Sequence, residues 1–438
     1  MATPKPPKPI PPKKKTLYVC YSNMNELPVY DKPNGKIVNR VLLSSYLIVT
    51  DSKQINDDKW LEIFTYGNDG WVREKNTTKT NHLKVFYVDV GQGDGALMEV
   101  GRSRFLFDGG SRKDSNMKRY LKWQYQGLTK NNYKVHFDGL FISHFDEDHY
   151  GGLIDIIADS NYTFKAIYVA GIGKFAAGKK ETVLGDKSGD LLTTYFENLQ
   201  DLKNKFGNDG QIVMKQFIKA VEKANKEGRL LEGIKRLCVI NPSKPVLVVE
   251  DTINDLPFII QVLGPIMQKE DHVKGFKWLK NASHTVNGHS LVLKVTYGTR
   301  SLLFGGDLNT DSEIDLLEFH KNDLSIFEVD VAKSCHHGSS EFTVDFMRAL
   351  NPYGTVISSG DNESYSHPRA DAIGCAGKYS RNEKPLVFST ELARSTNVPT
   401  QEIQYGLINL RSDGDVIYFA QKKETKALSD PWDSYGPL

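Results

Sequence analysis

Four side chains that can bind metal ions stand close together in ISHFDEDHYGG, which runs from residue 142 to residue 152. They are His144, Asp146, Asp148 and His149. The apolar residues before them predict a short strand, and a turn after it can direct the first two side chains to one side and the last two to the other. Two adjacent metal ions need such an arrangement. The alternative is a solvated acidic loop that contains two histidines by chance.

Two further candidates lie at the ends of later apolar runs. His289 directly precedes the run 290–297, and Asp307 follows the run 301–304 after two glycines. A carboxylate in that position can bridge two cations with its two oxygens. The alternatives are that Asp307 caps a helix beginning near residue 311, and that His289 is an ordinary histidine at the start of a strand.

The last candidates are His336 and His337 in KSCHHGSS and His367 in YSHP. One histidine of the pair could bind a metal in place of His367. Alternatively, one could face a substrate and stabilise charge on a phosphoryl oxygen, helped by the backbone and hydroxyl donors of residues 338–340. We favour the substrate-facing role and predict that Asp148, His336 and His337 are the catalytic residues. Asp148 or Asp307 would orient the attacking water.

Three more aspartates occur in short motifs near apolar runs. We interpret Asp89 and Asp108 as residues that order the loops beneath the site and do not bind metal. Asp94, in GQGDG, either approaches the site or forms a turn.

Six motifs in order resemble the metallo-β-lactamase superfamily, in particular the branch related to the hydrolase domain of the ComEC competence proteins. They are VDVGQGDGALMEV (88–100), LFDGG (106–110), ISHFDEDHYGG, NGHSLVLKVTYGTRSLLFGGDL (287–308), KSCHHGSS and ISSGDNESYSHP. The resemblance implies an αββα sandwich over residues 83–425 and a hydrolase that uses two metal ions to activate water. It covers the soluble hydrolase part of those membrane proteins.

The resemblance also implies a ligand set. One ion would be bound by His144, Asp146 and His289, the other by Asp148, His149 and His367, and Asp307 would bridge them. Asp146 stands where β-lactamases have a histidine. Because a carboxylate suits harder cations than an imidazole does, we expect Zn²⁺ or Mn²⁺.

The expected reaction is hydrolysis of a phosphodiester bond in DNA or RNA, and one hypothesis for its role is a toxic effector in antiphage defence. One alternative is a small-molecule phosphoesterase or an ester or lactone hydrolase on the same site. Another is a non-catalytic protein whose N-terminal domain binds a partner. Nine of the ten lysines between residues 174 and 226, all except Lys187, could follow a nucleic-acid backbone, but glutamates interrupt them.

The α/β hydrolase domain is preceded by a predicted small all-β domain over residues 16–80. Its sequences VYDKPNGKIV, KWLEI and GWV resemble a bacterial SH3-like barrel, which implies a possible protein partner. Residues 172–240 have helical spacing and predict a mostly helical insertion. We expect the Pro/Lys-rich residues 1–15 to be a disordered tail and residues 426–438 to be a C-terminal tail.

Composition favours an ordinary globular protein. Of 438 residues, 39% are hydrophobic and 25% charged, and the formal net charge of +2 does not by itself indicate a polyanion-binding protein. No run approaches the ~20 apolar residues that a membrane-spanning helix needs, so no membrane partner is expected. The four cysteines are scattered, and residues 1–15 lack the apolar core of a secretory signal. Together these features predict a cytoplasmic protein.

Overall fold

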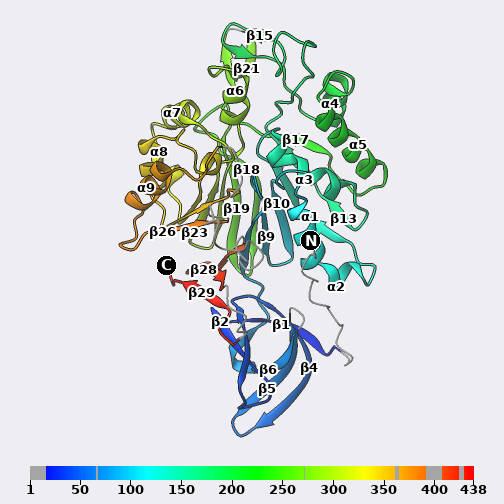
Figure 1. Cartoon of the computed structure of the whole chain (residues 1–438), viewed down its shortest axis with the longest axis vertical. Coiled ribbons are helices and arrows are strands. Elements are labelled where there is room, and N and C mark those ends of the chain that lie inside the picture. The colour runs from blue at the N-terminus through cyan, green and yellow to red at the C-terminus, as the bar shows by residue number, and fades with distance from the viewer. Residues whose placement is uncertain (1–15, 66–67, 271, 361–364, 391–406, 424–428) are drawn as a thin grey trace.

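The computed structural model describes residues 16–65, 68–270, 272–360, 365–390, 407–423 and 429–438. The tail predicted for residues 1–15 lies outside this range. Two mixed β-sheets pack face to face in the larger part of the molecule, helices cover their outer faces, and a smaller β-domain lies at one end (Figure 1). Among the helices of the described residues, we find none with the length and apolar character to cross a bilayer.

The first sheet has nine strands in the order β17-β14-β12-β10-β9-β8-β27-β28-β29. Its strands are β8 (Leu83–Val88), β9 (Ala96–Val100), β10 (Ser103–Phe107), β12 (Gly139–Ile142), β14 (Ile167–Val169), β17 (Ile234–Arg236), β27 (Leu407–Ser412), β28 (Ile417–Lys422) and β29 (Trp432–Tyr435). The strands from β17 to β10 run parallel, and the others are antiparallel. Helices on one face and a second sheet on the other bury β8 and β12 completely, so these strands are apolar runs rather than alternating ones.

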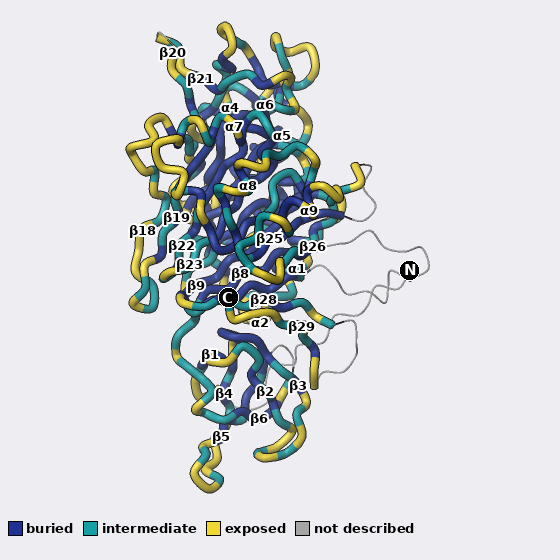
Figure 2. Tube along the Cα trace, turned by 90° about the vertical axis from the view of Figure 1, so that its left-hand side faces the viewer, coloured by how far each residue is buried: buried dark blue, intermediate teal, exposed yellow. Residues whose placement is uncertain are grey.

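The second sheet has seven strands in the order β18-β19-β22-β23-β24-β25-β26. They are β18 (Val246–Ile253), β19 (Leu256–Gly264), β22 (Val292–Tyr297), β23 (Arg300–Phe304), β24 (Val331–Lys333), β25 (Gly354–Ile357) and β26 (Leu386–Ser389). The strands from β23 to β26 are parallel. The rings of Phe107 in the first sheet and Phe304 in the second stack with centroids 4.1 Å apart, inside the core shared by both sheets. Figure 2 shows this buried interior in dark blue.

The helices form the two outer layers. The layer on the first sheet consists of α1 (Asn116–Gln124), α2 (Gln126–Thr129), α3 (Glu147–Ala158), α4 (Leu199–Phe206) and α5 (Ile212–Lys226). The layer on the second sheet consists of α7 (Thr310–Phe319), α8 (Val344–Leu350), α9 (Ala370–Lys378) and the 3₁₀ turn η2 (Leu324–Phe327). Smaller elements are α6 (Ala282–Gly288), the 3₁₀ turns η1 (Glu74–Asn76) and η3 (Cys335–Gly338), the pair β11 (Val135–Phe137) and β13 (Tyr162–Phe164), and a small sheet of β15 (Lys187–Ser188), β16 (Leu191–Leu192), β20 (Gln268–Glu270) and β21 (Val273–Lys277). Two mixed sheets between outer helices agree with the predicted αββα sandwich.

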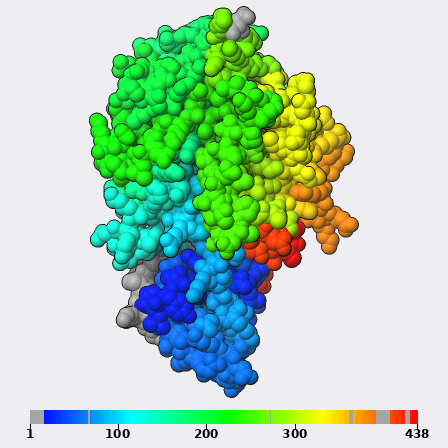
Figure 3. All heavy atoms as spheres, turned by 180° about the vertical axis from the view of Figure 1, so that it is seen from behind, coloured from blue at the N-terminus to red at the C-terminus, as the bar shows by residue number. Residues whose placement is uncertain are grey.

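The N-terminal domain is all-β, as predicted. Its seven strands are β1 (Tyr18–Ser22), β2 (Glu26–Tyr30), β3 (Ile37–Leu42), β4 (Tyr46–Ile55), β5 (Asp58–Thr65), β6 (Asn68–Arg73) and β7 (Thr77–Thr78). They form one antiparallel sheet around a core of their own, to which Leu61 contributes, and the adjacent Trp60 is also fully buried. Seen from behind, this domain is a distinct blue lobe below the larger one (Figure 3). Its SH3-like character stays a prediction.

Two segments differ in structure from the prediction. The segment 172–240 is not mostly helical, because α4 and α5 have 8 and 15 residues, a third of its 69. The helical spacing that begins at residue 191 does not form a helix there. The Asn198 side chain accepts a hydrogen bond from the backbone N–H of Asp201, and this cap starts α4 at residue 199. The described end of the chain is not a tail either, since β29 pairs with β28, and the Trp432 indole donates to the Arg40 carbonyl of the N-terminal domain.

Candidate metal centre

The candidate site lies where strands of both sheets end. The loop after β12 and the first turn of α3, together the metal-binding loop, carry His144, Asp146, Asp148 and His149. The loops after β23 and β24 carry Asp307 and the pair His336–His337, and the loops after β8 and β10 carry Asp94 and Asp108. The rigid sandwich thus places side chains from distant parts of the sequence at one edge of the two sheets. At residue 152 only glycine fits, because a Cβ there would lie 2.1 Å from the Gly109 carbonyl oxygen.

Three buried imidazoles have the same arrangement, with Nδ1 hydrogen-bonded and Nε2 directed toward Asp307. His149 Nδ1 donates to Asp108 Oδ2 at 3.0 Å, and His337 Nδ1 donates to the Ser358 carbonyl at 3.0 Å. His144 Nδ1 lies 3.0 Å from the Ser143 hydroxyl and 3.2 Å from that of Ser290. Metal-binding histidines are held in this way, with the second nitrogen fixed by a neighbouring group.

Asp307 is the centre of this cluster. Its Oδ2 lies 3.2 Å from Nε2 of His149, 3.2 Å from Nε2 of His337 and 3.9 Å from Nε2 of His144. His149 and His337 are themselves close, with 3.3 Å between their Nε2 atoms. Asp148 completes the group, since its Oδ2 lies 3.6 Å from His337 Nε2.

The charges of the cluster are strongly coupled. Burial and, to a smaller extent, the neighbouring His149 lower the pKa of His144 to about 4. Burial also disfavours charge on His337, but Asp307 and Asp94 more than offset this and raise its pKa to about 10. Burial alone would raise the pKa of Asp307, but His149 and His337 bring it well below the usual range. Without a metal ion, imidazolium and carboxylate groups therefore neutralise each other here.

The donor set fits a divalent cation. Ligand atoms of His144, His149 and Asp307 lie within 4.8 Å of one another, as do those of Asp148, His149 and His337. Two buried atoms of the cluster, His144 Nε2 and Asp307 Oδ1, have no hydrogen-bond partner. Since buried polar atoms are nearly always satisfied, these two atoms are best explained as ligands of an ion. Imidazole nitrogens and carboxylate oxygens are ligands of Zn²⁺ and Mn²⁺.

Asp94 and Lys333 form a buried ion pair beneath the cluster. Burial raises the pKa of Asp94, but the Lys333 ammonium together with His337 and His149 outweighs burial and brings the pKa to about 2. Asp94 Oδ1 also lies 3.2 Å from His337 Nδ1, so the pair helps to orient this imidazole. The sequence left the role of Asp94 open and gave none to Lys333. The available signal was a lysine at the end of the otherwise apolar β24.

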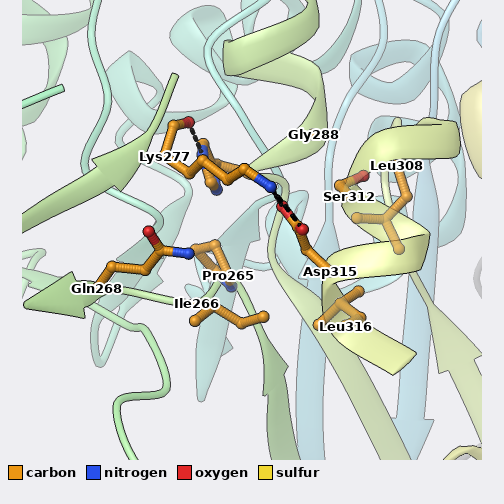
Figure 4. Close-up of a pocket in the computed structure, with 10 residues that line it drawn as sticks. Pro265, Ile266, Gln268, Lys277, Gly288, Leu308, Ser312, Asp315 and Leu316 are labelled. Carbon is orange, nitrogen blue, oxygen red and sulfur yellow. Dashed lines mark hydrogen bonds and ion pairs between the residues drawn. The ribbon is translucent and has the colours of Figure 1, made fainter. Parts of the chain in front are cut away.

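Contrary to the prediction, His289 lies outside this cluster. Its Nε2 donates to the Lys277 carbonyl at 2.8 Å, and its ring lies against Phe276. Burial lowers its pKa to about 4, so the imidazole is neutral. It lines a separate small pocket, where Figure 4 shows the Lys277 ammonium reaching the Asp315 carboxylate. The alternative interpretation of His289, an ordinary histidine beside a strand, describes this position.

The other predicted residues are arranged around the cluster. Among the described residues, the groups of three convergent ligand atoms include neither Asp146 nor His367. Asp146 forms an ion pair with Lys174, and the His367 ring lies at the edge, with its centroid 6.3 Å from that of His337. His336 is partly exposed, with Nε2 4.0 Å from Asp307 Oδ2, and its substrate-facing role stays a prediction. His337, also predicted to face the substrate, has the buried position of a ligand.

Comparison with curated proteins returns ComE operon protein 3 of Bacillus subtilis (strain 168), which is 29% identical over 163 residues. Over this stretch the chain is a homologue of ComE operon protein 3. The match covers 37% of the chain and 17% of the length of ComE operon protein 3. No protein-family model matches the chain.

Solved structures give distant likenesses. The metallo-β-lactamase fold protein YhfI of Bacillus subtilis is 12% identical, with a TM-score of 0.33 over 70% of this chain and 96% of its own. Human tRNase Z, short form, is 13% identical, with a TM-score of 0.29 over 70% and 93%. A diphosphatase of the PhnP family is 9% identical, with a TM-score of 0.30 over 75% and 97%.

Proposed function

We propose that the chain is a metal-dependent phosphodiesterase that cleaves DNA or RNA. The observation that carries this proposal is the convergence of His144, His149 and His337 on Asp307, each imidazole with its second nitrogen fixed. The oxygen donors in the set favour ions that also bind phosphate oxygens.

In this proposal the ligands divide into two groups that share His149. His144 and Asp307 belong to one group and Asp148 and His337 to the other, while the two oxygens of Asp307 allow it to bridge. Divalent ions bound here would lower the pKa of a water nucleophile and neutralise charge on the phosphoryl oxygens. This division includes none of three predicted ligands, namely Asp146, His289 and His367.

The remaining residues position the reacting groups. Gln92 Nε2 donates to Asp148 Oδ2 at 3.2 Å and holds this carboxylate at the outer side of the cluster. His336 adopts a left-handed backbone conformation with φ of 47°, which directs its ring to the partly exposed side, where Asn287 Nδ2 lies 3.5 Å from its Nε2. We assign to His336 the stabilisation of charge on the substrate.

A small-molecule phosphoester is the second candidate, and one observation favours it. Most lysines that the sequence offered for a nucleic-acid backbone pair with acids of the same insertion, as Lys179 does with Asp209 and Lys203 with Glu222. Paired lysines attract a polyanion less than free ones. A defence role and a protein partner of the β-domain stay predictions.

The test is a cleavage assay on single-stranded DNA, double-stranded DNA and RNA with Mn²⁺, Mg²⁺ or Zn²⁺ supplied. The Asp148→Ala, Asp307→Ala double variant is the negative control, and Glu147→Gln is the matched variant, because Glu147 is an exposed acid of the same loop. We expect metal-dependent cleavage that the double variant loses and Glu147→Gln keeps. Hydrolysis of bis(p-nitrophenyl) phosphate without nucleic-acid cleavage would favour the small substrate. Metal binding without any hydrolysis would contradict the proposal.

A further inference from the structure

Lys174 of the insertion reaches the metal-binding loop. Its Nζ lies 2.6 Å from Oδ1 of Asp146, and only 20% and 22% of the two side chains are exposed. Because the pair is largely shielded from water, its attraction is stronger than that of an exposed ion pair. Four other lysines of the insertion pair with acids of the insertion, whereas Lys174 pairs with an acid beside the candidate ligands.

The backbone around Lys174 is fixed. Its carbonyl accepts a hydrogen bond from the Gln211 N–H at the start of α5, and the next residue, Phe175, is buried with its ring stacked on that of Phe206. The Lys174 ammonium is therefore held near Asp146 by the fold of the insertion and is not a freely moving surface charge.

Asp146 is fixed by the same part of the molecule. The preceding residue, Phe145, is buried, and its ring packs edge-on against those of Phe196 and Phe217, both in the insertion. One aromatic core thus positions both members of the ion pair. The insertion therefore packs against the metal-binding loop and supports its position.

The ion pair has a consequence for metal binding. A carboxylate oxygen that contacts an ammonium at 2.6 Å cannot also bind a divalent cation there without bringing two positive charges together. Among the described residues, Lys174 forms an ion pair with Asp146 alone, so the histidines and Asp307 of the cluster can bind an ion while this lysine stays in place. Neither ligand group of the proposed function includes Asp146, and the ion beside His144, on the same loop, can gain this carboxylate as a further ligand only if Lys174 moves. The two metal positions are therefore unequal.

We propose that Lys174 is an internal counter-ion of Asp146 that weakens the binding of a second metal ion, so that the insertion controls how many ions the centre holds. This proposal rests on the metal centre of the proposed function. It assigns Lys174 a positioning role, since the residue acts through Asp146.

The experiment is a titration of the metal-free full chain with Mn²⁺ and with Zn²⁺, with bound ions counted after equilibrium dialysis. Lys174→Met removes the charge and keeps the side-chain length, Lys174→Arg keeps the charge, and Lys219→Met removes an exposed lysine from α5 of the same insertion. We expect the second ion to bind at least tenfold more tightly to Lys174→Met than to the natural chain. The first ion should bind all four proteins equally, and Lys174→Arg and Lys219→Met should match the natural chain throughout.

Equal second-ion affinity in Lys174→Met and the natural chain would overturn this proposal and leave the metal centre intact. Failure of all four proteins to bind any ion would instead overturn the proposed function, and this inference with it. Should Lys174→Met not fold, Lys174→Gln provides the same comparison, because its amide can still donate to Asp146 without a positive charge.

Discussion

The Asp108 carboxylate holds the His149 imidazole, with 3.0 Å between Oδ2 and Nδ1, while its Oδ1 accepts a hydrogen bond from the Ser143 N–H at 2.8 Å. Asp108 thus joins the strand end before the metal-binding loop to a histidine within that loop. We expect Asp108→Ala to weaken metal binding by about 10–100-fold, because the loss of such a partner leaves a ligand imidazole free to rotate.

Isothermal titration with Zn²⁺ measures this effect. Glu147→Gln is the control, because it changes the charge of the same loop at an exposed position. An Asp108→Ala protein that stays folded and binds Zn²⁺ as tightly as the natural chain would show that His149 needs no such support.

Mutation can test the positions of His337 and His289, which both differ from the prediction. His337→Ala removes an Nε2 that lies 3.2 Å from Asp307, so we expect the number or affinity of bound ions to fall at least tenfold. His289→Ala removes a ring that contacts Phe276 and Lys277, so we expect lower thermal stability and unchanged metal binding. Metal analysis and thermal melting of both variants test this. Loss of an ion in His289→Ala would restore the ligand set implied by the resemblance.

His337 and His289 also show which parts of the site could be predicted from the sequence. The strand ends were predictable because a buried parallel strand is a short apolar run, and polar residues directly after it must lie at the sheet edge. The position of a histidine ring at such an edge was not predictable, because it depends on the conformation of one backbone turn. His289 rotates toward the Lys277 carbonyl, whereas the left-handed conformation of His336 and His337, with φ of 47° and 54°, sends the second ring into the cluster. The contact between Lys174 and Asp146 depends on the packing of Phe145 against the insertion, which no local pattern encodes.

A second buried ion pair should govern stability. Lys84 and Glu99 face each other on β8 and β9, with Nζ 3.0 Å from Oε2, and Tyr125 donates to Glu99 Oε1 at 2.6 Å. Burial raises the pKa of Glu99, but Lys84, Arg104 and the Tyr125 hydroxyl together outweigh this and bring the pKa to about 2. Glu99→Gln would leave the Lys84 ammonium buried without a counter-charge, which typically costs about 3–5 kcal/mol.

Denaturation of the full chain in urea measures this loss. Glu74→Gln is the control, because it breaks the exposed pair of Lys59 and Glu74, and we expect no measurable change from it. Equal stability of the Glu99→Gln and Glu74→Gln proteins would mean that Lys84 finds water or another acceptor when its partner is removed.

Glu313 should make stability depend on pH. This carboxyl of α7 is buried, and burial raises its pKa from 4.5 to about 8, although the Thr343 N–H and hydroxyl donate to its Oε2 and oppose the shift. Between pH 4.5 and 8 the unfolded chain ionises this group while the folded chain keeps it protonated. The contribution of Glu313 to stability is therefore fully present below pH 4.5, declines by at most about 1.4 kcal/mol per pH unit as the pH rises, and levels off above pH 8.

Glu313→Gln should remove this dependence, because the amide is neutral at every pH and still offers an oxygen to Thr343. We expect the variant and the natural chain to melt at similar temperatures near pH 4.5, and the variant to melt higher at pH 8. Glu318→Gln, an exposed position on the same helix, should follow the natural chain at both pH values. A melting difference between Glu313→Gln and the natural chain that is the same at pH 4.5 and pH 8 would mean that Glu313 is ionised in the folded protein, with Thr343 stabilising its charge.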